Sequence, residues 1–396
     1  MYRFYSLFAG SLLLALTSCE RSDVEKAPEG EFKHVRLLVS DQSTNQIHLI
    51  TPQSGQVLPF QANHAGATLY GSESGRFGIV IHRTQNQTQT FDTGLEEHGD
   101  HVDIKGTPKW GLLVGNGALP THFKTKGDRW MIFNDGDATL DWAYESDIHS
   151  KPTMQRINSQ IRAHHGAMAP FSNGLIAITE KDGSVAGALP ERVRIINASG
   201  QTVFASSVAT RGIHGNATDG EVAVFGSSSG ILVVNQNGTQ RLISHPADFG
   251  TAWFGTIMET PQKGQFLGYT AARGVYWINT TTSTVTPLFE SNDIMQCKLA
   301  KSGMTLAILT HAGELTAIDL TTRNRIASGS VIPATTRDET QKPQLESTGQ
   351  FAYITQPKLG EIWQVQWNQL SKIQKIKTVS TPFRMAILGV ESNEDH

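Results

Sequence analysis

The chain has 396 residues, a formal net charge of −3 at pH 7 and only 17% charged residues. A net charge this close to zero leaves no basic footprint for nucleic acid, so we expect no nucleic-acid partner. The 37 glycines and the frequent Thr, Ser, Gln and Asn favour an all-β fold over a helical one. Length alone does not require a second domain, because all-β folds often reach this size as one unit.

The N-terminal segment has the pattern of an export signal. A short start with one arginine leads into the apolar stretch 7–16, which is too short to cross a bilayer comfortably. The segment ends in Leu-Thr-Ser-Cys, which resembles the lipobox of bacterial lipoproteins, in which the cysteine is acylated. We therefore predict a signal peptide over residues 1–19, a lipidated Cys19 and a flexible polar tether over residues 20–32. The expected location is the periplasmic face of the cell envelope, with the choice of membrane left open.

Cys297 is the only other cysteine, so the mature chain has no internal disulfide. It lies between two polar residues in a strand-like stretch. We interpret it as a small buried residue, in preference to a reactive or metal-binding thiol.

Short strand patterns recur in groups along the chain, with turn residues between them. The clearest group is 221–244, where Ser-Ser-Ser-Gly and Asn-Gln-Asn-Gly separate three apolar runs. The units repeat every 40 to 50 residues or so, as four-stranded propeller blades do. The residues that begin successive units are His122, His165, His214, Phe254, Cys297 and Gln344.

The two ends of the chain complete each other. Residues 35–60 supply three strands without an innermost one, and residues 382–390 supply a single strand that fits this place. We predict one β-propeller domain over 33–390 whose ring is closed by the C-terminal strand, followed by a polar tail over 391–396. The count is eight blades, or seven if one group of strands is misassigned.

Six of the fourteen histidines fall in short motifs, namely His98, His101, His122, His164, His165 and His214. Three of them, His122, His165 and His214, begin the innermost strands of consecutive blades and should converge at one mouth of the channel. Imidazole nitrogen suits Zn²⁺, which prefers four ligands in a tetrahedron. We interpret the other histidines as ordinary hydrogen-bonded residues, namely His34, His48, His64, His82, His149, His245, His311 and His396.

An insertion at residues 95–109 lengthens one repeat by roughly ten residues and carries the motif His-Gly-Asp-His. If it folds over the same mouth, it adds His98 or His101 to the site. Asp100 or Asp103 would then act as a carboxylate ligand, or would accept a hydrogen bond that fixes an imidazole tautomer.

These motifs together resemble the periplasmic zinc metallochaperones of the Azt type, over most of residues 33–390. That resemblance implies a propeller with a zinc site built from His98, His101, His122, His165 and His214, with His164 as a neighbour, and a partnership with the solute-binding protein of a zinc ABC importer. The matching stretches are HGDHVDI (98–104), PTHF with RWMIFNDGDA (120–138), AHHGAMAPFSNGLIAIT (163–179), IHGNATDGEVAVFG (213–226) and FGTIMETP (254–261).

The chain departs from that family in two ways. Many members carry a histidine-rich flexible segment and a cysteine pair, whereas this chain has Ser206, Ser207 and Ser227 in the corresponding stretch and only His34 near its N-terminus. The lipid anchor is the second departure. Together they favour a fixed zinc site that stores or senses zinc, or delivers it only near the membrane.

Three functions remain open at this point. The first is a zinc-binding chaperone without catalysis. The second is a zinc hydrolase, similar to propeller lactonases, with Glu96, Glu97 or Asp100 as general base. The third is an interaction scaffold for envelope proteins whose histidines are incidental. Nucleotide-binding motifs are absent from the sequence, which excludes an ATPase.

Overall fold

The computed structural model describes residue 1 and residues 30–395. A compact unit begins at Glu31. The predicted signal peptide, Cys19 and most of the predicted tether lie outside the described residues. Among the residues that are described, no helix has the length and apolar character needed to cross a membrane.

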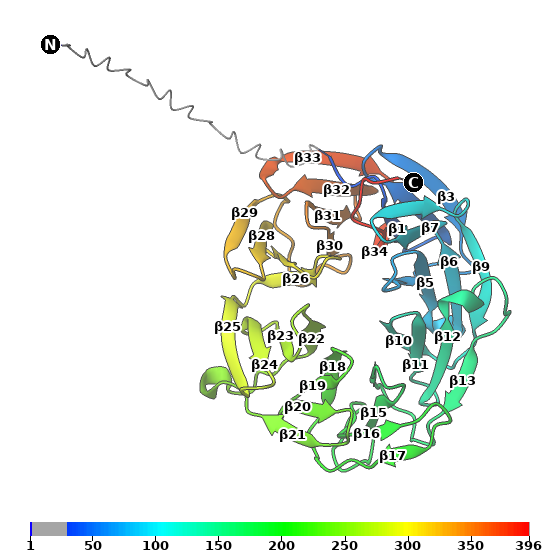
Figure 1. Ribbon diagram of the computed structural model, residues 1–396, viewed down its shortest axis with the longest axis vertical. Helices are drawn as coiled ribbons and strands as arrows, with labels where there is room; N and C mark the ends of the chain where they lie inside the picture. The colour runs from blue at the N-terminus through cyan, green and yellow to red at the C-terminus, as the bar shows by residue number, and fades with distance from the viewer. Residues whose placement is uncertain (2–29, 396) are drawn as a thin grey trace. The chain divides into compact units, whose positions relative to one another are not determined.

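Eight four-stranded sheets form a ring, which confirms the eight-bladed propeller (Figure 1). Each blade is given from its innermost to its outermost strand, and the first three blades are β34 (Pro382–Gly389), β1 (Val35–Asp41), β2 (Gln46–Thr51), β3 (Gln56–Gln61); β4 (Thr68–Gly71), β5 (Phe77–His82), β6 (Gln87–Asp92), β9 (Lys109–Gly115); and β10 (Pro120–Lys126), β11 (Arg129–Asn134), β12 (Thr139–Tyr144), β13 (Gln155–Asn158). The next three blades are β14 (Met168–Pro170), β15 (Ile176–Glu180), β16 (Arg192–Ile196), β17 (Thr202–Phe204); β18 (Ile213–Thr218), β19 (Val222–Ser227), β20 (Gly230–Asn235), β21 (Gln240–Ile243); and β22 (Thr256–Glu259), β23 (Gln265–Thr270), β24 (Gly274–Asn279), β25 (Thr284–Glu290). The last two blades are β26 (Ile294–Leu299), β27 (Thr305–Thr310), β28 (Glu314–Asp319), β29 (Arg325–Ser330); and β30 (Leu345–Ser347), β31 (Phe351–Gln356), β32 (Glu361–Gln366), β33 (Gln369–Lys377).

The C-terminal strand closes the ring, as predicted. β34 pairs antiparallel with β1, from Val35 opposite Gly389 to Ser40 opposite Arg384. One blade therefore contains the first three strands and the last strand of the chain. This arrangement joins the two ends of the domain through a ladder of backbone hydrogen bonds.

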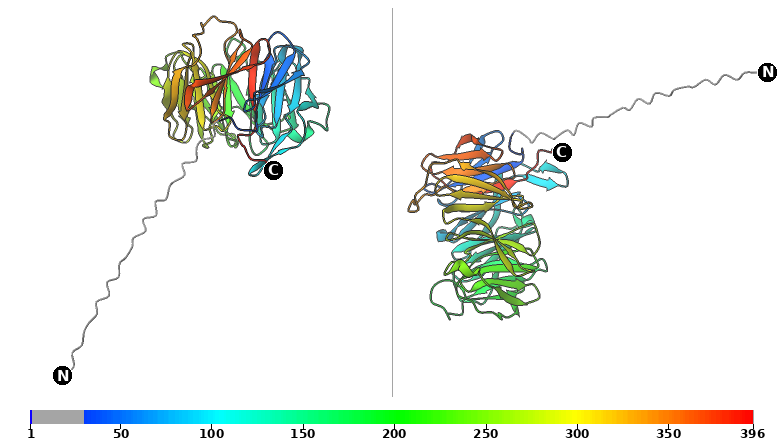
Figure 2. Two further views of the ribbon diagram at one scale, coloured as in Figure 1. Left: turned by 90° about the horizontal axis from the view of Figure 1, so that it is seen from above. Right: turned by 90° about the vertical axis from the view of Figure 1, so that its left-hand side faces the viewer.

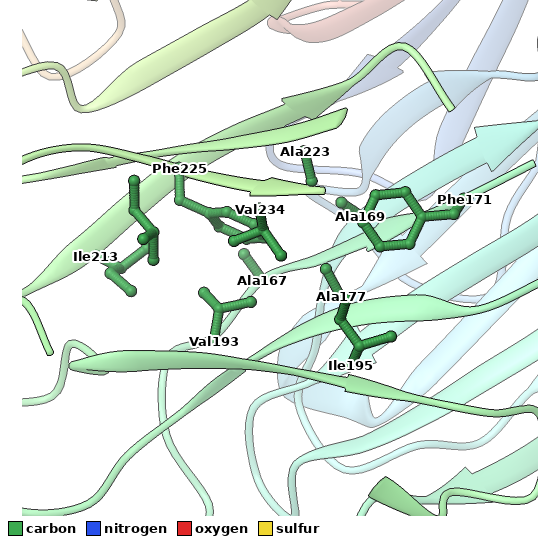
Figure 3. Close-up of a cluster of buried hydrophobic side chains, with 11 residues drawn as sticks. Ala167, Ala169, Phe171, Ala177, Val193, Ile195, Ile213, Ala223, Phe225 and Val234 are labelled. Carbon is green, nitrogen blue, oxygen red and sulfur yellow. The ribbon is translucent and has the colours of Figure 1, made fainter. Parts of the chain in front are cut away.

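The core lies between blades. Each middle strand has neighbours on both of its faces, so it is apolar on both, as in β5, where all six residues are buried. Figure 3 shows one such interface, where Ala177 and Ile195 of one blade pack against Phe225 and Val234 of the next. Stacking of successive blades explains why the strand runs read as continuous apolar stretches in the sequence.

The innermost strands enclose a central channel and all run in the same direction through it. We call the side on which they begin the start face, and the side on which they end the end face. In each blade the third strand runs parallel to the innermost one, so it also finishes at the end face. This direction decides on which side each loop of the propeller lies.

A short hairpin extends the second blade at the end face. β7 (Leu95–His98) and β8 (His101–Ile104) pair with His98 opposite His101, and Gly99 takes a φ of +68° in the two-residue turn. The hairpin follows β6, and Figure 2 shows it in cyan on the same side of the ring as the C-terminus. The amide of Val102 donates to the carbonyl of Glu394, just beyond β34, at 3.2 Å.

Candidate metal centre

Three histidines from consecutive blades meet on one wall of the channel. The ring centroids of His122 and His165 lie 5.0 Å apart, those of His165 and His214 5.4 Å, and those of His122 and His214 6.2 Å. All three side chains are half-buried and line one cavity of about 220 Å³. The predicted convergence of these three residues is therefore present in the fold.

The three residues reach this place from different registers. His122 lies inside β10 and His214 is the second residue of β18, while His165 stands three residues before β14. The pairing of β10 with β11 shifts next to His122, and that of β18 with β19 shifts next to His214. Such irregularities turn a side chain away from the ordinary alternation of a strand, and here they accompany rings that face one another.

Gly215 accommodates the irregularity in β18. Its φ is +75°, a conformation that side chains rarely adopt, and a Cβ there would meet the carbonyl oxygen of Gly255 at 2.5 Å. This close approach of the two backbones also brings His214 next to Gly255. The carbonyl oxygen of Gly255 accepts a hydrogen bond from Nδ1 of His214 at 2.7 Å. A carbonyl only accepts, so Nδ1 of His214 carries a proton and Nε2 is the ring nitrogen left for a metal ion.

Asp135 orients His165 in a similar way. Nδ1 of His165 donates to Oδ2 of Asp135 at 2.7 Å, and Arg83 donates to the same oxygen at 3.0 Å. Burial alone would raise the pKa of Asp135, but the hydrogen bonds from His165 and Arg83 outweigh it and the pKa is lowered. The carboxylate is therefore ionised at neutral pH and leaves Nε2 of His165 to bind a metal ion.

His122 is held neutral by its surroundings. Burial and the neighbouring His165 lower its pKa to about 4, with His214 and Lys124 acting in the same direction and Asp135 against it. At pH 7 its imidazole carries no proton that a metal ion would have to displace. The cluster thus combines a neutral His122 with two imidazoles whose Nδ1 atoms are already hydrogen-bonded, those of His165 and His214.

His164 has a different role from its neighbour. Its ring is 5% exposed, with Nδ1 against the carbonyl of Arg162 at 2.7 Å and Nε2 against the hydroxyl of Thr179 at 2.9 Å. Both ring nitrogens are therefore engaged within the protein. His164 anchors the segment that carries His165.

The hairpin carries a second group of possible ligands. One ligand atom each from His98, His101 and Asp103 lies within 4.8 Å of the others. Oδ2 of Asp103 is 3.7 Å from Nδ1 of His98, and its Oδ1 is 3.6 Å from Nε2 of His101. Asp100 accepts from Nδ1 of His101 at 3.1 Å. His98 is exposed, so this group is open to solvent.

The condition under which this insertion would add ligands to His122, that it folds over the same mouth, is not met in the structure. The hairpin follows the third strand of its blade and lies at the end face, where Glu96 pairs with Arg76 of the β4–β5 turn at 2.9 Å. His122 and His214 lie near the beginnings of their strands, toward the start face. The insertion was correctly expected to form a loop on one face, but the sequence does not show which face. The histidines therefore form two separate groups.

Sequence reasoning missed Asp135, Arg83 and the carbonyl of Gly255. Asp135 falls in the stretch RWMIFNDGDA, directly after β11, so its position at the end of a strand was a usable signal. Arg83 and Gly255 come from other blades and have no such signal. Burial raises the pKa of Cys297 to about 12, which agrees with an unreactive thiol.

The described histidines outside these groups make other contacts. His34 pairs with Asp395 at 2.9 Å, and His149 pairs with Asp92 at 2.8 Å. His48, His82, His245 and His311 each have a hydrogen-bond partner, and the ring of His64 packs edge-on against His82 at 5.2 Å.

Fold and site together define an eight-bladed β-propeller with a histidine cluster in its channel. Solved structures share this architecture. AztD from Citrobacter koseri superposes with a TM-score of 0.79 at 19% identity, over 91% of this chain and 99% of that one, and its apo form gives 0.78. The dihydro-heme d1 dehydrogenase NirN is more distant, with a TM-score of 0.59 at 13% identity over 88% of this chain and 74% of the other. No protein-family model matches the chain. The chain is thus an AztD-like β-propeller in its fold.

Proposed function

We propose that this chain is a zinc-binding protein of the bacterial envelope that holds Zn²⁺ on His122, His165 and His214 and passes it on without catalysis. The observation that carries the proposal is the meeting of three imidazoles from three blades within 6.2 Å between ring centroids. Hydrogen bonds at Nδ1 of His165 and His214 present Nε2 of both rings as ligand atoms. Nitrogen ligands of this kind suit zinc.

Transfer of the metal fits a site with three protein ligands. Zinc prefers four, so a fourth position remains for water or for a ligand from a receiving protein. Exchange of ligands at that position moves the ion without breaking the site first. The resemblance to Azt-type metallochaperones supports this role, and the solute-binding protein of a zinc ABC importer is the partner that it suggests.

The lipid anchor is part of the proposal. Acylation of Cys19 would fix the protein to a membrane. The propeller begins at the end face, where the carboxylate of Glu31 accepts hydrogen bonds from Thr348 and Tyr353. Attachment at that face leaves the start face, near which the channel histidines lie, accessible to a partner.

We propose that the chain does not act as an enzyme. The carboxylates considered as general bases, Glu96, Glu97 and Asp100, lie on the hairpin at the end face. A general base must be within hydrogen-bond reach of the proton that it takes, directly or through one water. These three residues and the channel histidines are at different faces of the propeller.

Titration with zinc against a competing chelator tests the proposal. The protein with His122, His165 and His214 all changed to Ala should lose its high-affinity zinc, while the variant with His98→Ala and His101→Ala serves as control and should keep it. Unchanged affinity in the triple variant would overturn the proposal. In parallel, Cys19→Ser should move the protein from the membrane to the soluble fraction of the envelope.

A further inference from the structure

The wall of the channel opposite the histidines is basic. A cavity of about 680 Å³ lies between the innermost strands β4, β26, β30 and β34. Its charged lining consists of three cations and two carboxylates, namely Lys298, Lys301, Arg384, Glu73 and Glu346. Lys124 adds a further cation from the histidine side of the channel. The basic wall itself therefore carries an excess of one positive charge.

A smaller cavity of about 270 Å³ continues from this one near the beginning of β34. It shares Arg384, Gln296 and Gln344 with the larger cavity and adds Lys342. None of the described residues that line it is an Asp or a Glu. This end of the basic wall offers cations and amide groups to a ligand.

Arg384 lacks a carboxylate partner among residues 30–395. Its Nη1 donates to Oε1 of Gln344 at 2.5 Å, and its guanidinium lies over the ring of Phe383 at 4.5 Å. Burial lowers its pKa, with only Tyr70 acting in the opposite direction. By contrast, Lys298 pairs with Glu346 at 2.6 Å. Arg384 is half-buried, and a partly desolvated guanidinium without a carboxylate partner favours the binding of an anion.

Gln344 holds Arg384 in a defined orientation. Its Nε2 donates to the carbonyl of Lys342 at 3.1 Å, so its Oε1 is directed to the guanidinium. A guanidinium has five N–H donors, and the bond to Gln344 uses one of them. The others form the planar fork that matches a carboxylate.

We propose that the basic wall binds a small carboxylate anion, with its carboxylate on the guanidinium of Arg384. Lys342 and the side-chain amide of Gln296 line the same end of the wall and offer further donors to the anion. Tyr70 lines this cavity and the histidine cavity, and its hydroxyl donates to the carbonyl of Thr121, next to His122, at 3.3 Å.

The test is calorimetric titration of the metal-free full-length protein with succinate, which chelates zinc weakly. Binding is expected at millimolar or lower concentration, with at least about a tenfold loss in Arg384→Gln, because a charge-assisted bidentate contact is removed. Arg384→Lys keeps the charge and loses the fork, so it should bind with intermediate affinity. Arg325→Gln is the matched control, because Arg325 also lies over a phenylalanine ring, but on an outer strand.

Two further titrations decide the chemistry of the ligand. Phosphate should bind more weakly than succinate, and the neutral diamide of succinate should not bind. Equal binding of succinate by the native protein and Arg384→Gln, or no binding by either, would overturn the inference. Thermal unfolding of each variant verifies its fold, and Gln344→Ala, which removes the acceptor that orients Arg384, gives a second route if Arg384→Gln does not fold. Because metal is left out, failure of the zinc site does not affect this result.

Discussion

Asp135 determines which nitrogen of His165 is available to a metal. Asp135→Asn removes the ionised acceptor at Nδ1, and a neutral amide fixes the tautomer less strongly. We expect zinc affinity to fall by about 10- to 100-fold with little change in fold. Competition with a chromogenic chelator measures the affinity.

The chain offers a close control for this change. Asp92 also accepts from an arginine and a histidine, Arg76 and His149, but away from the channel cluster. Asp92→Asn should leave zinc affinity in the channel unchanged. Equal losses in both variants would indicate a general destabilisation and would contradict the role assigned to Asp135.

The low pKa of His122 predicts a pH-dependent stability. An unfolded histidine takes up a proton near pH 6.5, whereas His122 in the fold does so at about pH 4, because burial and the neighbouring His165 disfavour its charged form. Between these values the unfolded state binds more protons, so this contribution is fully present above pH 6.5 and is lost as the pH falls toward 4. It amounts to at most about 3 kcal/mol.

His122→Gln should remove that contribution in the metal-free protein. The free energy of unfolding, measured in urea at several pH values, should fall less steeply between pH 6.5 and 4 than in the native chain. His64→Gln, which changes a histidine outside the channel, is the control. Parallel pH profiles for the native protein and His122→Gln would show that His122 is not held neutral.

At the residue scale, the residue types and their repeat positions in the sequence predicted which histidines form the channel cluster. His122, His165 and His214 were predicted to converge because they recur at blade length, and their rings do meet. The partners of these rings were not predictable in the same way. Arg83 and Gly255 lie in other blades, so their contacts depend on how blades pack, which no local pattern reports.

At the scale of elements, the hairpin β7–β8 is independent of the channel. Its base is tied to the end face by the Glu96–Arg76 pair and by the bond from Val102 to Glu394. The insertion was recognised by its length, but its face follows from strand direction within the blade. The insertion lies at the end face because β6, which precedes it, is the third strand of its blade and ends at that face.

Two separate groups predict two zinc ions with unequal affinity. The hairpin group has three possible ligands and an exposed His98, so it should bind more weakly than the channel cluster. His98→Ala with His101→Ala should reduce the stoichiometry from two to one in mass spectrometry under native conditions, while the tighter affinity remains. Loss of the tight site in this double variant would contradict the separation of the two groups.

At the scale of the molecule, β34 joins the two ends of the ring and should make its stability global. Leu388 of β34 is fully buried and packs with Leu38, Leu69 and Phe91 between the closing blade and the next. Leu388→Ala should cost about 2 to 5 kcal/mol, because it leaves a cavity in this interface. In a closed ring, that loss should weaken every blade.

Hydrogen exchange measured blade by blade distinguishes a closed ring from an open array. If closure couples the blades, amides of β15 and β19, across the ring, should lose protection by the same free energy as those of β1. In an open array each unit contacts only its neighbours and unfolds with its own stability, so only the closing blade and its neighbours would change. Leu359→Ala is the control, because Leu359 is 52% exposed and its loss should cost less than about 0.5 kcal/mol. Unchanged protection in β15 and β19 of Leu388→Ala would show that the eight blades do not unfold as one unit.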